Sequence, residues 1–456
     1  KLGESVIARV PGLAVEPDEA FIEKEVPNAH HMLETSAHGG ITDPLARAGF
    51  YYHLTGKLGW AELFKRLAYL MYEDFQRGRE QYGGPWGMDA DFRLHKMMPA
   101  WDLVEEAPVF TAEDRLQITR IYAQFIRDCI PHADAALRDR LARHNHTTFA
   151  ALGLLYAGLY FRKYYGLREA SDWLHIADEC FIPQCQGSRP IEDSNGYQWV
   201  TLEHTLRYSL ARPYSPFLED GHLRQACDLV ITSLDNLGYQ ASYGDTGNPF
   251  GWGSELPLLS AAAWYYRDGR YQWVLQRQHS QPFHLGVAGE IGSYNAGIEP
   301  VEPREHAGIT CLPLDRRFYI STKGPDYLPF ESAFDKHAFR ADFRSDSEYL
   351  LLDGLSCGGH RHYDGNSFIR LTAFGCIWLA DCDYYCSTPN FHNGVLPWRN
   401  GRSEIIPPFT RREIVADLAH CGFSRTTVKG YAGCDWERNI IWRKGHGFRI
   451  CSEVGG

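Results

Sequence analysis

The sequence lacks the features that mark several large protein classes. It has no run of about 18 consecutive apolar residues, so no membrane-spanning helix and no membrane partner are expected. Its 12 cysteines include no Cys-x-x-Cys pair and no zinc-finger spacing. Their spacing fixes neither a disulfide pairing nor a redox compartment. No fixed-length repeat is visible, which argues against an ordinary repeat array.

Excess positive charge is also missing. The chain has 46 basic and 57 acidic residues, and its formal net charge is -11. This balance argues against nucleic acid as the main partner, because phosphate backbones are bound by an excess of lysine and arginine. An anionic substrate stays compatible with it, since a local basic cleft can lie in an acidic protein.

Length and composition indicate a globular protein with more than one domain. The chain has 456 residues, of which 44% are hydrophobic and 23% charged, and a chain of this length exceeds one ordinary core. The 12 tryptophans and 26 tyrosines suit either sugar-binding grooves or aromatic helix cores. Lys1 is not a methionine and no signal-peptide core follows it, so we expect a mature form or an expressed segment.

The texture of the sequence changes once, near residue 285. Apolar residues recur at helical spacing from residue 30 to about 280, which predicts successive amphipathic helices in a toroid or solenoid. A stretch rich in glycine and proline follows, and then short β-rich runs that favour an antiparallel sheet or sandwich. We therefore predict a helical domain over 1–285, a linker over 286–310 and a β-domain over 311–456. The β-rich runs continue to the last residues, so the β-domain could be truncated.

The segment "SCGGHRHYDGNSFIRL" carries the strongest chemical signal. On a strand, His360, His362 and Asp364 face the same way, and the next hairpin would bring Asp381 back toward them. His392 follows in a loop. Imidazoles and carboxylates suit zinc or manganese, and the set His362, Asp381 and His392 would leave His360 free to touch a substrate. The alternative is a solvated polar turn with unrelated histidines.

Two helical segments are further candidates. Asn145 and His146 begin an apolar helix, where backbone N–H groups favour an anion, although a simple N-terminal cap explains them as well. His204 and Tyr208 stand four residues apart and share a helix face that could transfer protons or could be ordinary core.

Together these segments resemble the heparinase II/III-like superfamily of polysaccharide lyases, which includes alginate lyases and the dermatan sulfate epimerase. The quoted motifs are "PAWDLVEEAPVFTAEDR", "HNHTTF", "NGYQWVTLEHTLRY" and "HRHYDGNSF…LADCDYY…PNFHN". The resemblance implies an α+β multidomain fold, with an N-terminal α/α toroid (an incomplete barrel) and a C-terminal antiparallel β-sandwich. It also implies a secreted or periplasmic location.

The resemblance implies roles for individual residues. Asn145 would neutralise a uronate carboxylate, His146 would act in the acid/base set and His360 would complete the catalytic pocket. A structural divalent metal, zinc or manganese, would be held by His362, Asp381 and His392.

The position of the catalytic tyrosine departs from the family pattern. His204 stands nearest the position where the family has its tyrosine, Tyr208 follows one turn later, and Tyr197 lies at the helix start. We favour Tyr208 as the proton carrier, with His204 assisting and Tyr197 binding substrate. Candidate contacts to acidic sugars are Arg143, Arg207 and Arg361; Arg207 could instead pair with Glu203.

The expected function is β-elimination on a uronic-acid-containing polysaccharide such as alginate, glucuronan or a glycosaminoglycan-like polymer. A uronate C5-epimerase is the closest alternative, because it begins with the same proton abstraction. A glycoside hydrolase would need paired acids, for which Asp89, Asp91 and Asp102 are candidates. A binding module without catalysis is the third alternative. The exact polymer, endo or exo action and the oligomeric state are left open.

Overall fold

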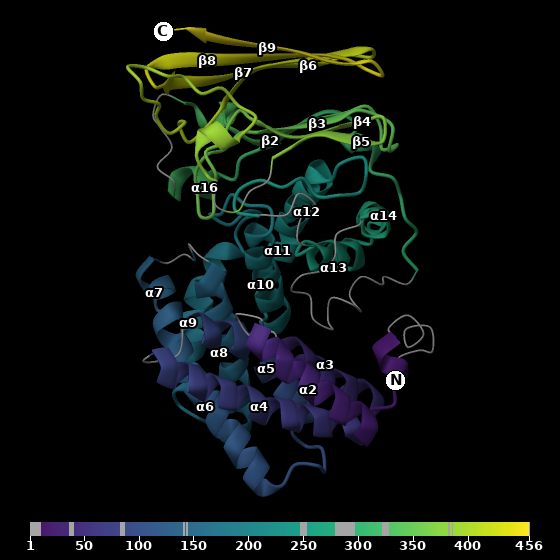
Figure 1. Cartoon of the computed structure of the whole chain (residues 1–456), viewed down its shortest axis with the longest axis vertical. Coiled ribbons are helices and arrows are strands. Elements are labelled where there is room, and N and C mark those ends of the chain that lie inside the picture. Colours follow the sequence, from purple (N-terminus) through teal and green to yellow (C-terminus); the bar gives the residue numbers. More distant parts are fainter. Residues whose placement is uncertain are drawn as a thin grey trace. The chain divides into compact units, whose positions relative to one another are not determined.

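The structure is a computed structural model that describes residues 11–35, 41–82, 87–139, 142, 145–246, 253–278, 297–321, 328–381, 384 and 386–455. These residues fall into two compact units (Figure 1). The first contains the described residues up to Gln184 together with Leu210–Arg212. The second contains Cys185–Ser209 and the described residues from Pro213 onward. The predicted domain limits at 285 and 310 do not coincide with this division and stay a prediction.

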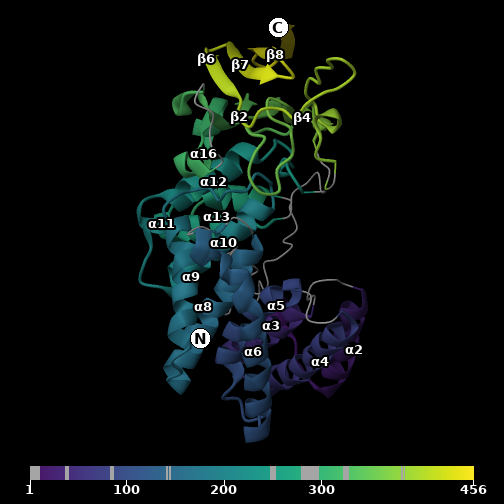
Figure 2. The ribbon, with the colours of Figure 1, turned by 90° about the vertical axis from the view of Figure 1, so that its left-hand side faces the viewer.

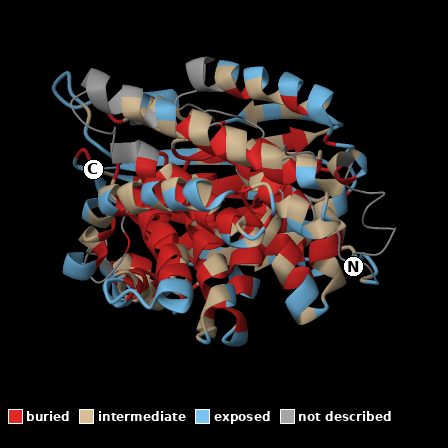
Figure 3. Cartoon of the chain, turned by 90° about the horizontal axis from the view of Figure 1, so that it is seen from below, coloured by how far each residue is buried: buried red, intermediate tan, exposed pale blue. Residues whose placement is uncertain are grey.

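The first unit is helical. Its helices are α2 (Glu19–Thr35), α3 (Thr42–Thr55), α4 (Leu58–Tyr82), α5 (Gly87–Val104), α6 (Ala112–Ala133), α7 (Ala135–Asp139), α8 (Asn145–Tyr165) and α9 (Ala170–Gln184), after the 3-10 turn η1 (Pro11–Ala14). Helix α8 packs against α5, α6 and α9 and is buried over most of its length. Figure 3 colours buried residues red and exposed residues pale blue, and both colours alternate along outer helices, which is the amphipathic pattern expected from the sequence.

The start of α6 confirms a local prediction. Thr111 and Asp114 form a reciprocal capping box, in which each side chain accepts a hydrogen bond from the other residue's backbone N–H. The two bonds satisfy N–H groups that have no partner inside the helix, so the helix begins where the sequence indicates.

The second unit combines helices with two sheets. Its helices are α10 (Tyr197–Ala211, whose last two residues group with the first unit), α11 (Pro216–Glu219), α12 (His222–Ser233), α13 (Leu256–Tyr266), α14 (Gly269–Arg277) and α16 (Arg316–Ser321), with 3-10 turns η2 (Arg304–His306), η3 (Phe330–Ser332) and η4 (Pro389–Phe391). One antiparallel sheet has the order β1 (Gly308–Pro313), β2 (Phe334–Arg340), β3 (Tyr349–Asp353), β4 (Phe368–Ala373), β5 (Cys376–Ala380). The other has the order β6 (Arg411–Asp417), β7 (Cys421–Tyr431), β8 (Cys434–Arg443), β9 (Gly447–Gly455).

The two sheets form a β-sandwich. Phe339 and Leu350 of the first sheet share a buried cluster with Ile440 and Trp442 of the second. The opposite face of the five-stranded sheet packs on the segment around Tyr243, and Figures 1 and 2 show α12 on that side. One sheet therefore has two covered faces, which explains why β2 and β3 are buried at every position.

Three local expectations from the sequence were wrong. The run "DRRFYIST", which lies in the region where β-rich runs were expected, contains helix α16. Strand β2, "FDKHAFR", was not expected, because its polar residues are buried rather than alternating with apolar ones. Residues 360–364 are loop and not strand, so His360 and His362 do not gain a common direction from strand pleating.

Two bulk expectations can be compared with the described residues. None of the helices in the described ranges is long and apolar enough to cross a membrane. The cysteines in those ranges are free thiols, so they contain no disulfide.

A buried ionic network lies where β2 and β3 meet the segment before α10. The Lys336 ammonium is fully buried, and its Nζ lies 3.1 Å from Asp193, 3.2 Å from Asp335 and 3.0 Å from Asp353. Arg189 adds a second cation, 2.5 Å from Asp193 and 3.0 Å from Asp335. The attraction of these carboxylates raises the pKa of Lys336 against the opposing effect of burial. The lysine therefore stays charged and holds three chain segments together.

Removing this ammonium should be costly. We expect Lys336→Met to lower the free energy of unfolding by about 3–5 kcal/mol, because three buried carboxylates lose a shared cation. Lys429→Met, which breaks a half-exposed pair with Asp435, should cost less than about 1 kcal/mol. Urea titration followed by circular dichroism measures both values, and equal losses in the two variants would contradict a structural role for Lys336.

Candidate active site

The loop that carries the histidines is fixed by backbone hydrogen bonds. His360 has a left-handed backbone with φ 51°, a conformation that costs a non-glycine residue about 1–3 kcal/mol. Its carbonyl oxygen accepts from the N–H of Asp245 at 2.9 Å, and the preceding Gly359 exchanges two bonds with Ile191 and Asp193. These bonds hold His360 in place despite the strain.

The segment opposite the loop requires a glycine. Gly244 has φ 62°, and a Cβ there would lie 2.2 Å from the Asp193 carbonyl oxygen and 2.6 Å from that of His360. Only a residue without a side chain allows these backbones to approach so closely.

Two aromatic side chains accompany His360. The Tyr197 ring stacks on the imidazole, with centroids 3.7 Å apart and planes 8° apart. The Tyr197 hydroxyl forms a short hydrogen bond with the hydroxyl of Tyr384. Burial, together with this bond, raises the pKa of Tyr197 above its usual value, so the phenol is protonated at neutral pH. The arrangement stacks a protonated phenol on an imidazole. These two groups could act as an acid and a base.

Carboxylates face the two loop histidines. The Glu192 carboxylate lies 3.4 Å from Nδ1 of His360. The Asp245 carboxylate lies 2.8 Å from Nε2 of His362. His362 is almost completely buried, and the contact with Asp245 fixes the orientation of its ring.

A group that could hold a metal ion lies next to these residues. Ligand atoms of Asp364, Asp381 and His392 lie within 4.8 Å of one another. Nδ1 of His392 lies 2.9 Å from Asp381, while its buried Nε2 and both buried oxygens of Asp364 make no hydrogen bond. Burial raises the pKa of Asp364 to about 6. Buried ligand atoms without partners fit a divalent cation, because a cation would compensate both the charge and the missing bonds.

The predicted ligand set and the observed group differ in one member. Asp381 and His392 were both predicted, and the β4–β5 hairpin returns Asp381 to this site as expected. His362 was predicted as a ligand, but its Nε2 lies against Asp245, although its ring centroid is 5.2 Å from that of His392. Asp364 was seen in the sequence and left out of the set. The ligand role of His362 stays a prediction.

Asp364 also belongs to a second group of acids. Its carboxylate lies within 4.8 Å of those of Asp193 and Asp353. Lys336 already lies 3.1 Å and 3.0 Å from these two. The lysine therefore supplies a cation on that side, and Asp364 joins the ionic network to the candidate metal group.

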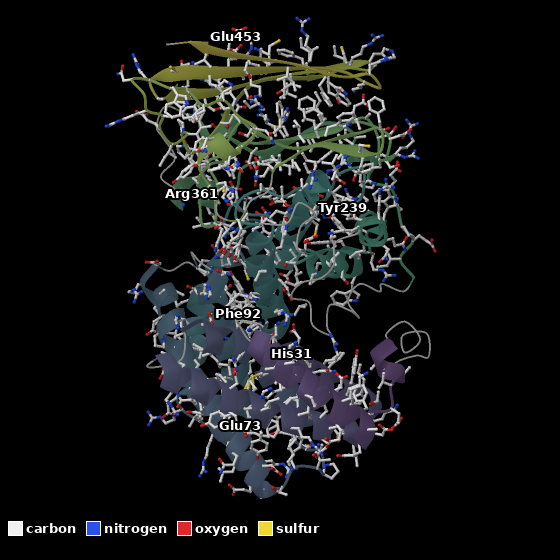
Figure 4. All side chains as sticks on the ribbon, viewed as in Figure 1. His31, Glu73, Phe92, Tyr239, Arg361 and Glu453 are labelled. Carbon is white, nitrogen blue, oxygen red and sulfur yellow. The ribbon has the colours of Figure 1, made fainter. Side chains whose placement is uncertain are left out.

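In the first unit, Asn145 and His146 begin α8 as predicted. His146 Nδ1 lies 2.9 Å from the fully buried Asp91 carboxylate, and its ring contacts Phe92 edge-on at 5.3 Å; Figure 4 labels Phe92. Burial raises the pKa of Asp91, while the bond to His146 lowers it. Asp91 thus fixes the His146 ring. The convergence of Asn145 and His146 with residues of the second unit stays a prediction.

Helix α10 carries the remaining acid/base candidates. His204 and Tyr208 are 2% and 1% exposed, so neither reaches solvent from its place in the helix. Tyr197, at the start of the helix, is only partly buried. Glu203 and Arg207 form the ion pair that the sequence allowed, at 2.5 Å.

Of the other two arginine candidates, the structure describes Arg361 but not Arg143. Arg361 is exposed, and its guanidinium donates to the Gly358 carbonyl and to the Tyr363 hydroxyl; Figure 4 labels it in this loop. Arg143 lies outside the described residues. The proposed sugar contacts of both stay predictions.

Several residues of the site were not found from the sequence. Glu192, Asp245 and Tyr384 were not singled out, and Asp91 was considered only as a hydrolase acid. No local pattern connects them to the histidines, because each meets its partner only through folding.

Comparison with known proteins identifies the fold. No protein-family model and no curated protein matches the chain. Among solved structures, the heparan sulfate lyase HepC from Pedobacter heparinus matches at TM-score 0.52 and 14% identity, over 89% of this chain and 60% of that one. A heparinase III gene product matches at 0.56 and 13%, over 90% and 63%. Another heparinase III structure matches at 0.57 and 11%, over 89% and 63%.

The chain has a heparinase-like polysaccharide lyase fold. The predicted fold class, an α/α toroid followed by an antiparallel β-sandwich, is confirmed. The chain spans about 60% of the length of these structures. At this identity the likeness establishes the fold, and the activity has to be argued from the residues.

The metal group can be tested by ligand substitution. We expect Asp364→Asn and His392→Gln to bind a divalent ion more than about 10-fold more weakly than the wild type. With metal at about 100 times its dissociation constant, its loss should lower the free energy of unfolding by about 3 kcal/mol. Elemental analysis of dialysed protein and thermal melts with and without chelator measure these effects.

His362→Gln decides between the two ligand sets. Full metal content in this variant would remove His362 from the set, and full metal content in Asp364→Asn would remove Asp364. Asp435→Asn, an exposed change on β8, is the control and should leave metal content unchanged.

Proposed function

We propose that this protein cleaves a uronic-acid-containing polysaccharide by β-elimination. The observation that carries this proposal is the Tyr197–His360 stack, which joins a protonated phenol to an imidazole in a chain with the fold of heparan sulfate lyases. An acid and a base side by side suit a reaction in which one proton is removed and another is delivered.

The reaction explains why both groups are needed. A lyase removes the C5 proton of a uronate and expels the sugar linked through O4, which leaves a 4,5-double bond. The C5 proton is a very weak acid while the neighbouring carboxylate is charged. Hydrogen bonds that stabilise the charge developing on this carboxylate contribute about 3 kcal/mol per donor, and each positioned proton transfer about 10²–10⁴-fold in rate.

We assign these steps to named residues. His360 takes the C5 proton, and Tyr197 donates its proton to the leaving O4. Asn145 and His146 are the proposed donors to the substrate carboxylate. This assignment moves the proton-carrying role from Tyr208 to Tyr197, because Tyr208 is 1% exposed, whereas Tyr197 is only partly buried and stacks on His360.

A divalent metal ion would have a structural role. Asp364, Asp381 and His392 would hold it, with His362 as a further candidate ligand, and zinc suits this mixture of imidazole and carboxylate better than calcium or magnesium. When bound, the ion would hold the histidine loop together through its ligands. Manganese is the second candidate.

The substrate is an anionic polysaccharide, with alginate, glucuronan and glycosaminoglycans as candidate classes. The solved structures with this fold include heparan sulfate lyases by name, which supports a glycosaminoglycan-like polymer. We propose a secreted or periplasmic location, since such polymers lie outside the cytoplasm. Hydrolysis has less support, because Asp91, one of the candidate acids, is paired with His146.

A panel of uronic-acid polymers tests the proposed function. We expect ultraviolet absorbance to rise during incubation with at least one polymer, because elimination creates a conjugated unsaturated uronate. New reducing ends without this absorbance would indicate hydrolysis. Exchange of C5 hydrogen with solvent deuterium, without chain cleavage, would indicate epimerisation.

Tyrosine substitutions test the acid assignment. We expect Tyr197→Phe to lower kcat by about 10²–10⁴-fold at a nearly unchanged melting temperature, because only the hydroxyl is lost. Tyr208→Phe should keep most of the activity. Tyr431→Phe, a buried tyrosine of the sandwich, is the matched control. Loss of activity in Tyr208→Phe but not in Tyr197→Phe would return the role to Tyr208.

A further inference from the structure

Glu192 is a buried carboxylate held beside His360 by the backbone. It is 1% exposed and lies in a segment that pairs in parallel with Gly359. The N–H of Gly359 donates to Ile191 at 2.8 Å, and the N–H of Asp193 donates back to Gly359 at 2.9 Å. The two bonds flank Glu192, so its Cα has a fixed position relative to the next loop residue, His360.

Each oxygen of the Glu192 carboxylate has a neighbouring polar group. Oε2 accepts a hydrogen bond from the Thr201 hydroxyl of α10 at 2.9 Å. Oε1 lies 3.4 Å from Nδ1 of His360, within ion-pair distance but long for a hydrogen bond. Stacking on Tyr197 sets the plane of the imidazole, and the carboxylate distinguishes the two edges of the ring.

Asp193, the next residue, has a different task. Its carboxylate is bound by Lys336 and Arg189, which are both buried cations. Of these two adjacent acids, Asp193 therefore belongs to the ionic network and Glu192 faces the candidate site. This difference argues against treating Glu192 as one more member of the network.

The chemistry of imidazole gives this contact a consequence. A neutral imidazole carries one proton, and a carboxylate beside Nδ1 favours the tautomer with that proton on Nδ1. In this tautomer the ring lone pair that can accept a proton is on Nε2, at the opposite edge of the ring. The same carboxylate stabilises the imidazolium that forms when Nε2 accepts a proton.

We propose that Glu192 is a positioning residue that holds His360 with Nδ1 protonated and Nε2 ready to accept the C5 proton. This inference rests on the proposed lyase function. In this step, the electron pair of the C5–H bond forms the 4,5-double bond. The C4–O4 bond breaks, and O4 receives the Tyr197 proton. The C5 proton stays on His360 and returns to the tyrosinate through solvent before the next turnover.

Kinetics of Glu192 variants provide the first test. We expect Glu192→Gln to lower kcat by about 10²-fold with little change in KM, in the range known for residues that orient a reacting group. Glu192→Asp should recover part of the loss, because it keeps the charge. Glu348→Gln, another buried glutamate of the second unit, is the control and should keep full activity. An unchanged kcat in Glu192→Gln would overturn the proposal.

Nitrogen NMR of ¹⁵N-histidine-labelled protein provides a second test that needs no substrate. The His360 signals are assigned by their absence in His360→Gln. We expect the Nδ1-protonated tautomer in the wild type and a changed tautomer ratio in Glu192→Gln; unchanged His360 shifts would overturn the proposal. If Glu192→Gln does not fold, Glu192→Ala carries the same comparison, because it also removes the carboxylate beside Nδ1.

The two tests separate the two proposals. A wild type that cleaves no uronan, yet shows the expected His360 tautomer and its dependence on Glu192, would refute the lyase function alone. An active wild type whose His360 shifts ignore Glu192 would refute the positioning role alone.

Discussion

The candidate site depends on one buried charge, the Lys336 ammonium. Three carboxylates surround it, and each comes from a different position in the chain: Asp193 precedes α10, Asp335 is the second residue of β2 and Asp353 ends β3. Burying these acids would be prohibitive without the cation, and burying the lysine would be prohibitive without the acids. The interaction is therefore satisfied only when all three segments are in place. The network therefore favours the one arrangement of these segments in which every buried charge has a partner.

The ionic network also fixes the position of the candidate functional residues. Asp193 is bound by the lysine through its side chain and by Gly359 through its backbone, so the histidine loop is anchored to the ionic network. The loop needs such anchoring because His360 has a left-handed backbone. Asp364 extends the network in the other direction, toward a group suited to a divalent ion. Strain at His360 and unpaired oxygens at Asp364 are both local costs, and features of this kind gather at functional sites.

The sequence predicted the site unevenly, and the reason is the range over which each signal acts. Asp381 and His392 lie in one hairpin and its following loop, so their approach follows from short-range antiparallel pairing. Asp245 meets His362 across 117 positions, and Tyr384 meets Tyr197 across 187. Nothing in the neighbourhood of these residues distinguishes them from ordinary polar positions. A single sequence therefore indicates which loop carries candidate functional residues, but not which distant side chains lie beside them.

The order of helices followed by antiparallel strands was determined by the sequence itself, because apolar periodicity is a local consequence of which face each element buries. The capping box at Thr111 and the turn between β4 and β5 are local in the same sense. Strand β2 was decided only by tertiary structure, since its polar residues become acceptable through partners elsewhere in the chain. Our proposal of Tyr197 rather than Tyr208 rests on the same kind of information: both lie on α10, and only packing leaves one beside His360 and buries the other. Burial and long-range pairing are properties of the folded chain, and they cannot be inferred from local patterns in the sequence.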